Sequence, residues 1–335
     1  GVQDADYEVR INAASLQQVQ LDVIEQVKAA YYEVIRQAKI VDVALQAIGR
    51  DEQLLAQSQS KLEAGLATRR DQLSAEIILA QDRGKLADAE TAYDEALDTL
   101  ALVMGVRIGH RLELADRDID LKPVDIDEEA WIAKALRHNP TIRAARLTVQ
   151  RNRLATRLAG NARLPQLDLS LTYTLNEDAD LNEAKIEKNI RRVFLEGDDP
   201  KPLDTTTFKG WSTFLTLSYP LGNKSLGNAH KRSQLVYDQS QRNREDIERQ
   251  ITTEIRSAIR NLRNSLVRLE ILDKEIEGAR DKLEFASINF QLGRASNLDV
   301  TDAQKDLMDA EIDYVNEVVD YLVSIARIEA LVGGF

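Results

Sequence analysis

The sequence contains no cysteine, and it is poor in aromatic residues and proline. Without cysteine, the chain has no disulfide bonds, thiolate metal sites or cysteine nucleophiles. Only 5% of the residues are aromatic whereas 30% are charged, which is typical of long helices that bury narrow seams and not of a thick globular core. A length of 335 residues would ordinarily predict two or three domains, but very long helices favour one elongated unit.

Long apolar runs and basic clusters are also lacking. No apolar run reaches the roughly 18 residues that a transmembrane helix needs. The first residues, Gly1 to Asp4, have neither the basic nor the apolar region of a signal peptide and read as an internal start. Because the net charge is −12 and no basic block stands out, we expect no binding to nucleic acid.

The sequence does contain an internal repeat. A short helix break from Phe290 to Ala303 repeats an earlier break from Leu62 to Ala75, at an offset of 293 − 65 = 228 residues. The same offset aligns, without a gap, about Val23–Gly105 with Ile251–Gly333. The chain is therefore predicted to hold two copies of one helix–turn–helix unit.

Apolar residues at every seventh position predict that the long helices pack as antiparallel coiled-coil hairpins. The first helix is predicted over about residues 6–62 and ends at Gly65, which suits a left-handed cap. Its second seam is weak because Gln37, Asp51 and Ser58 join it, so we expect this helix to pack on small or wet neighbours. The seven-residue series are Val27, Val34, Val41, Ile48, Leu55 and Leu62 in the first copy, and Ile255, Leu262, Leu269, Ile276, Leu283 and Phe290 in the second.

The predicted fold is mainly α, with one β-hairpin between the two helical repeats. The expected parts are a helical hairpin over 1–105 with its tip near 65, a connector over 106–126, helices over 127–163, a β-hairpin over 164–221 with a long charged loop at 176–210, and a second helical hairpin over 222–335 with its tip near 293.

Two segments beside the charged loop alternate between apolar and polar residues, as strands with one apolar face do. Each is about as long as a tilted strand that crosses a bilayer, and aromatic residues near the ends fit an interfacial girdle. A half-buried soluble hairpin has the same alternation, so both readings stay open at this point. The apolar face comprises Leu167, Leu169, Leu171, Tyr173, Leu175, Trp211, Leu215, Leu217 and Tyr219.

Catalytic and metal-binding patterns were also sought. His110, His138 and His230 share no spacing on one element, so no metal site is expected. The sequence shows no Gly-rich phosphate loop, no Ser/His/Asp order and no isolated acid pair in an apolar pocket. We therefore expect neither an enzyme nor a cofactor.

The order of these features resembles the TolC-type outer-membrane efflux protein family, also called outer membrane factors. The residues that carry the resemblance are Ala135–Pro140 in a short amphipathic helix, Leu164–Leu169 at the start of the first strand, and Leu217–Leu221 before a long helix. No single motif is specific, but the order and the internal repeat together cover essentially the whole chain.

The resemblance implies a homotrimer in the outer membrane of a Gram-negative bacterium, in contact with outer-membrane lipid. Strands would pool into one trimeric membrane β-barrel and long helices into a periplasmic tunnel. The function implied is a passive exit duct of a tripartite efflux or type I secretion system, which receives small molecules or polypeptides from a periplasmic adaptor and an inner-membrane pump. The alternative is a soluble coiled-coil structural or interaction protein.

A full family member holds two copies of a helix–strand–strand–helix order. By the offset of 228, Gly1 aligns with Ala229, just beyond the second strand. The N-terminal part of the first repeat is therefore expected to be missing, and we expect the gene product to carry about a hundred further residues and a signal sequence.

The resemblance also implies site residues at the hairpin tips. Asp299 and Asp302 match the family's two constricting aspartates, and Asp71 matches the first-copy aspartate of its closing links. Around a threefold axis, such carboxylates would raise the local concentration of cations. Because Asp71 and Asp299 follow Thr68 and Ser296 by three residues, they also fit helix caps.

The family's closing tyrosine falls at Phe290, which lacks the hydroxyl, and its closing arginine falls at Ala295. Nearby arginines are candidates to pair with Asp71 or Asp299 instead. These candidate entrance locks are Arg69, Arg70 and Arg294. The turns where family members meet the adaptor correspond to Gly65, Leu66, Ala67, Leu292, Gly293, Arg294 and Ala295.

Overall fold

The computed structural model describes residues 1–65, 67–107, 114, 127–179, 183–197, 199, 205–219 and 224–334. These residues are mainly helical, as predicted. In chain order the elements are α1 Val2–Glu63, α2 Arg69–Val103, α3 Glu128–His138, α4 Pro140–Asn161, β1 Gln166–Ala179, α5 Glu183–Arg191, the π-helix Arg192–Glu196, β2 Thr205–Ser218, α6 Lys224–Gln291 and α7 Asn297–Val332. Within the described ranges, no helix is both long and apolar enough to cross a membrane.

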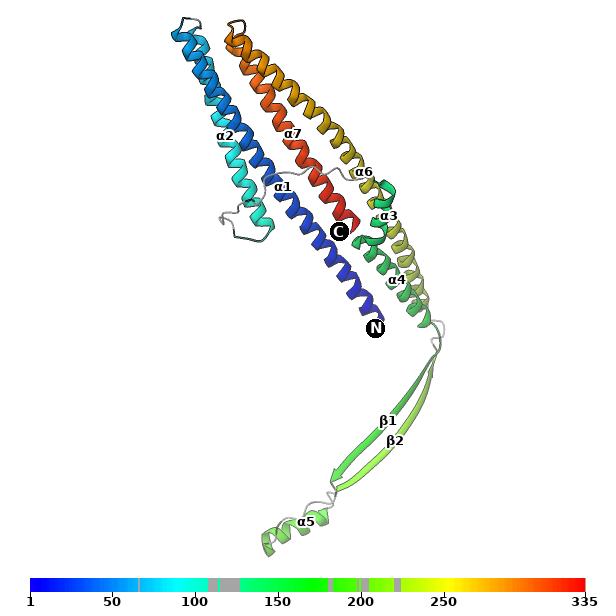
Figure 1. Cartoon of the computed structure of the whole chain (residues 1–335). Coiled ribbons are helices and arrows are strands. Elements are labelled where there is room, and N and C mark those ends of the chain that lie inside the picture. The colour runs from blue at the N-terminus through cyan, green and yellow to red at the C-terminus, as the bar shows by residue number, and fades with distance from the viewer. Residues whose placement is uncertain are drawn as a thin grey trace. The chain divides into compact units, whose positions relative to one another are not determined.

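The chain divides into two compact units. One comprises Gly1–Arg151 and Gln239–Phe335, and the other comprises Asn152–Asp238. The first unit holds both helical hairpins, formed by α1 with α2 and by α6 with α7 (Figure 1). The second unit holds the β-hairpin with the helix ends that flank it.

The two helical hairpins have the same backbone design, which confirms the predicted repeat. The first long helix of each copy ends before a glycine in the left-handed region, Gly65 at φ 72° and Gly293 at φ 71°. The return helices also end before glycines with positive φ, Gly105 at 69° and Gly333 at 96°. A residue with a Cβ rarely adopts this conformation, so glycine at these offsets fixes where each helix stops.

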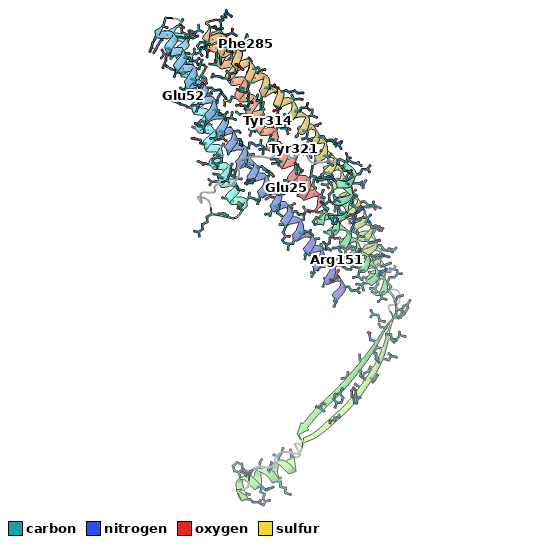
Figure 2. The ribbon with its side chains drawn as sticks, in the orientation of Figure 1. Glu25, Glu52, Arg151, Phe285, Tyr314 and Tyr321 are labelled. Carbon is teal, nitrogen blue, oxygen red and sulfur yellow. The ribbon has the colours of Figure 1, made fainter. Side chains whose placement is uncertain are left out.

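The main hydrophobic core of the first unit lies where α3 and α4 pack against α6 and α7. Tyr321 on α7 is fully buried in it, and Figure 2 marks its position. The other buried members are Ala135, Ile142, Ile251, Ile255, Ile259, Leu262, Leu269, Val318, Ile328 and Val332. The seven-residue series of the second copy thus supplies one side of this core.

Helix α1 packs on α7 as well as on α2. Val43 and Ala47 of α1 bury Met308 of α7, which joins the two hairpins into one unit. Of the small or wet neighbours expected for the second seam of α1, wet ones are excluded at two positions, because Asp51 is only 2% exposed and Ser58 is fully buried. The Ser58 hydroxyl is satisfied within its own helix by donating to the carbonyl of Leu54 at 2.8 Å.

In the second unit, β1 and β2 pair antiparallel over 14 residues each. The strands are longer than predicted, since residues 176–179 and 205–210 of the expected charged loop belong to the ladder, which runs from Thr174↔Gly210 to Ala179↔Thr205 in this region. Helix α4 is joined to α6 in this unit by Thr156, whose hydroxyl donates to the carbonyl of Ser233 at 3.0 Å. Most of the predicted connector over 106–126, and the tip residue Leu66, fall outside the described residues.

Candidate functional site

The tip of the first helical hairpin is built around a capping box. The Asp71 carboxylate accepts hydrogen bonds from the backbone N–H of Thr68 at 2.9 Å and from its hydroxyl at 2.7 Å. In return, the N–H of Asp71 donates to the Thr68 hydroxyl at 3.4 Å. These bonds lower the pKa of Asp71 from its ordinary value, chiefly through the Thr68 side chain and then its backbone. The carboxylate stays charged and anchors the start of α2.

The tip of the second hairpin repeats this geometry. The Asp299 carboxylate accepts from the backbone N–H and the hydroxyl of Ser296, both at 2.7 Å. These two bonds also lower the pKa of Asp299. The capping interpretation of both aspartates is therefore correct in each copy, and a capping carboxylate remains negatively charged at neutral pH.

Asp302 lies one turn beyond Asp299 on α7 and is exposed. It has no capping role, because the box at this terminus is complete with Ser296 and Asp299. Its counterpart in the first copy, at the offset of 228, is Ser74. The second copy thus carries one carboxylate more than the first copy on the opening turns of its return helix.

The candidate entrance locks form no ion pair with these aspartates among the described residues. Arg69 instead donates to the side-chain oxygen of Gln72 at 2.7 Å, one turn along its own helix. Arg70 acts on Asp71 through its charge alone, as the smallest of the influences on that carboxyl. Arg294 is exposed at the tip of the second hairpin.

Two other contacts join the tips, and neither was predicted from the sequence. The ammonium group of Lys61 donates to the backbone carbonyl of Phe290 and lies 3.9 Å from the centre of its ring. The side-chain amide of Asn297, which is buried, donates to the backbone carbonyl of Asp71 at 2.8 Å. Each contact connects a residue of one copy to a residue of the other, so the two hairpins are fastened together at their tips.

The tip turns present small or exposed groups. Gly65, Gly293, Arg294 and Leu292 are exposed, whereas Ala67 and Ala295 are half-buried. Ala295 packs on the cluster formed around Phe290. Among the described turn residues, Gly65, Ala67, Gly293 and Ala295 are small, whereas Leu292 and Arg294 are large and exposed.

One face of the β-hairpin is mainly apolar and the other is mainly polar, although Phe214 lies on the polar face opposite Ser170 and Thr213 lies on the apolar face opposite Leu171. The register places Leu167 opposite Leu217, Leu169 opposite Leu215, and Tyr173 opposite Trp211. The rings of Tyr173 and Trp211 lie 4.6 Å apart between centroids. Residues that face one another across strands lie on the same side of a sheet, so the predicted apolar positions within β1 and β2 share one face, and Tyr219 lies just beyond the end of β2. Each of them is exposed in this chain.

A comparison with protein-family models identifies the family of this chain. The model of the family described as "Outer membrane efflux protein" matches residues 131–334, which include α4, the β-hairpin and the whole second helical hairpin. The chain belongs to the outer membrane efflux protein family. The resemblance inferred from the order of motifs is therefore confirmed.

Individual relatives extend the match to the rest of the chain. The outer membrane protein TolC of Vibrio cholerae is 24% identical over 321 residues, covering 94% of this chain and 68% of the relative. The solved structure of the outer-membrane channel OprN has a TM-score of 0.78 at 19% identity, covering 99% of this chain and 70% of that one. The crystal structure of VceC from Vibrio cholerae has a TM-score of 0.78 at 17% identity, and the match covers 99% of this chain and 74% of VceC. The structural likenesses show the fold.

Membership in this family places the chain in the outer membrane of a Gram-negative bacterium, with its helical part in the periplasm. Its homologues are channels, not enzymes.

Proposed function

We propose that this chain is one subunit of a homotrimeric, passive exit duct, which serves a tripartite efflux or type I secretion system. The β-hairpins would line up in a membrane barrel, and the helical hairpins would form a periplasmic tunnel. Small molecules or polypeptides would pass outward from an inner-membrane pump and a periplasmic adaptor. The pump would supply the energy, because a water-filled tunnel has no chemistry of its own.

The observation that carries the proposal is the exposed apolar face of the β-hairpin. A two-stranded hairpin is at best marginally stable in water, and a contiguous apolar face on it is a liability for a soluble protein. In a membrane barrel the apolar face of such a sheet would contact lipid, and the opposite face would contact the aqueous lumen. Each strand has 14 residues, more than the roughly 9–11 that a tilted strand needs to cross a bilayer, so its polar end would project beyond the membrane.

The helical tips support a narrow inner end. In a threefold assembly, Asp302, Asp299 and Asp71 would each contribute three carboxylates around one axis. The low pKa values of the two capping aspartates keep these groups charged, so the ring would attract cations and disfavour anions. The tip turns around Gly65 and Gly293 would receive the helical tips of the adaptor, since small side chains let another helix approach closely.

Adjacent residues on opposite faces of β1 provide a matched test. Leu169→Arg places a charge on the face proposed to meet lipid, and Ser170→Arg places the same charge on the opposite face. We expect Leu169→Arg to cost about 2–4 kcal/mol near the bilayer centre and to lower the yield of detergent-extracted trimer, measured by native mass spectrometry. Ser170→Arg should leave that yield close to wild type.

The soluble coiled-coil alternative predicts a different outcome. Such a protein would be monodisperse without detergent, and the two substitutions would then have similar small effects. Recovery of a detergent-free monomer or filament, unaffected by Leu169→Arg, would refute the membrane duct.

A further inference from the structure

A pair of carboxyl groups is buried between the two helices of the first hairpin. Asp51 of α1 is 2% exposed, and the side chain of Asp82 on α2 is 13% exposed. The two positions face each other across the hairpin, and Asp82 raises the pKa of the Asp51 carboxyl through a side-chain hydrogen bond and through its charge. The remaining oxygen of Asp51, Oδ2, has no hydrogen-bond partner among the described residues. An ionised carboxylate can only accept, so this bond requires a proton on one of the two groups.

The second copy shows that the fold does not need these carboxyls. At the offset of 228, Asp51 corresponds to Ala279 (279 − 51) and Asp82 corresponds to Ala310 (310 − 82). Both alanines are buried in a small apolar cluster. The cluster consists of Ile276, Ala279, Leu307 and Ala310, and its counterparts in the first copy are Ile48, Asp51, Leu79 and Asp82. The same layer thus holds two methyl groups in the second helical hairpin and two carboxyl groups in the first.

The surrounding charges compensate only one negative charge. Lys85 lies 2.8 Å from Asp82 through its Nζ and the Oδ1 atom, and its side chain is half-exposed. Arg50, next to Asp51 in sequence, points its Nη2 atom toward Glu311 of α7 at 3.7 Å. No ion pair of Asp51 exists in the described part of the chain. A second negative charge on the pair would therefore have no ion-pair partner among the described residues, and the charge of Arg50 would offset it only in part.

We propose that Asp51 and Asp82 share one proton and make the packing of α1 against α2 sensitive to pH. With the proton present, the carboxyls hold the two helices together through their hydrogen bond. Without it, two adjacent carboxylates repel each other in a layer that is largely shielded from water, and the middle of the hairpin opens more often. The second hairpin, with alanines in this layer, has no such response.

The direction of the effect follows from linkage. Burial first, then the hydrogen bond to Asp82 and its negative charge, raise the pKa of Asp51 from 3.8 to about 7, while the charges of Arg50 and Lys85 oppose the shift. A folded-state pKa above the unfolded value means that the folded hairpin binds the proton more tightly. Its stability is therefore greatest at acidic pH, and it decreases as the pH rises through about 7.

Amide hydrogen exchange on the full-length protein measures this opening directly, once rates are corrected for intrinsic exchange. We expect the opening constant of α1 and α2 around Asp51 and Asp82 to rise roughly tenfold to fiftyfold between about pH 5 and pH 7. The layer around Ala279 and Ala310 serves as an internal control and should show no such rise. Equal pH dependence of the two layers would overturn the proposal.

Variants test whether the pH dependence comes from the shared proton or from the packing of the two helices in general. The double variant Asp51→Ala/Asp82→Ala copies the second hairpin, and Asp51→Asn keeps the shape if the double variant fails to fold. Both should abolish the pH dependence of opening and the infrared carbonyl band of a buried protonated acid. Glu52→Gln is the control, since Glu52 is exposed and pairs with Arg83 at 2.9 Å. Its pH dependence should match wild type.

Persistence of the pH dependence or of the infrared band in Asp51→Asn would refute a shared proton on this pair. These readouts do not depend on the chain forming an exit duct. If the membrane tests fail, the proposed function is refuted and this inference is unaffected. If the hydrogen-exchange and infrared tests fail, this inference is refuted and the proposed function is unaffected.

Discussion

Replacing Lys61 by methionine is expected to loosen the junction between the two hairpin tips. In the intact chain the Lys61 ammonium donates to the carbonyl of Phe290 and sits over its ring, at 3.9 Å from the centre. A charged hydrogen bond contributes about 1.5–3 kcal/mol, and a cation–π contact contributes about 0.5–2 kcal/mol. Because one ammonium group makes both contacts, their contributions do not add. A net loss of about 2 kcal/mol corresponds to a roughly thirtyfold increase in the ratio of separated to joined tips.

The absence of cysteine makes the measurement direct, since two introduced cysteines can be spin-labelled without background. Spin labels at Glu63 and Gln291, the last residues of α1 and α6, report the distance between the tips by double electron–electron resonance spectroscopy. We expect one narrow distance distribution in the parent protein and a second, longer population in Lys61→Met. The contact of Asn297 with Asp71 remains and limits the separation.

Lys274→Met is the matched control. Lys274 lies on α6, and its one ion pair among the described residues is an exposed pair with Glu270 on its own helix at 3.3 Å, which contributes little to stability. Adding Phe290→Leu to Lys61→Met removes the ring but keeps the carbonyl, so the double-mutant cycle isolates the cation–π part. If Lys61→Met and Lys274→Met give the same distribution as the parent, the tips are not held by Lys61.

Two predictions concern the packing of α3, α4 and α7. Gly333→Ala should destabilise the first unit by about 1–3 kcal/mol, measured by thermal unfolding, because φ is +96° there and a Cβ would lie 2.6 Å from the His138 carbonyl oxygen. Gly278→Ala, in open space on α6, is its control and should not destabilise. Asn139→Ala should cost about 1–3 kcal/mol, since the buried amide donates to the Leu331 carbonyl at 2.9 Å and accepts from the Ile142 N–H at 3.1 Å. Asn139→Asp keeps the acceptor for the Ile142 N–H but loses the donor to the Leu331 carbonyl. If it lowers the stability as much as Asn139→Ala does, the hydrogen bond to Leu331 accounts for most of the contribution of Asn139.

The local features of this fold could be predicted because each depends on a few consecutive residues. Thr68 with Asp71 and Ser296 with Asp299 form the capping boxes that their spacing indicated. The left-handed glycines Gly65 and Gly293 also lie where the helices were expected to stop. Such signals need no knowledge of distant parts of the chain.

The ends of the strands were missed for a tertiary reason. Asn176, Glu177 and Asp178 have low strand propensity, and the sequence therefore predicted that the loop begins there. In the structure they continue the ladder opposite Phe208, Thr207 and Thr206. Backbone pairing with the opposite strand outweighs the preference of single residues.

The contacts between copies could not be predicted because they join residues far apart in sequence. Lys61 and Phe290 are 229 positions apart, and Asn297 and Asp71 are 226 apart. The buried pair of Asp51 and Asp82 was missed for a related reason. Heptad spacing places Asp51 on a seam, but whether that seam is wet or dry depends on how α2 and α7 cover it. The expectation that no isolated acid pair lies in an apolar pocket is not contradicted by Asp51 and Asp82, because Lys85 forms an ion pair with Asp82 at 2.8 Å.

Single-channel recording of the purified full-length protein in planar lipid bilayers tests the exit duct most directly. The duct predicts a defined unitary conductance with a preference for cations, because charged carboxylates of Asp71, Asp299 and Asp302 would surround its narrow inner end. A preparation that forms no channels, or one whose channels prefer anions, would contradict this account.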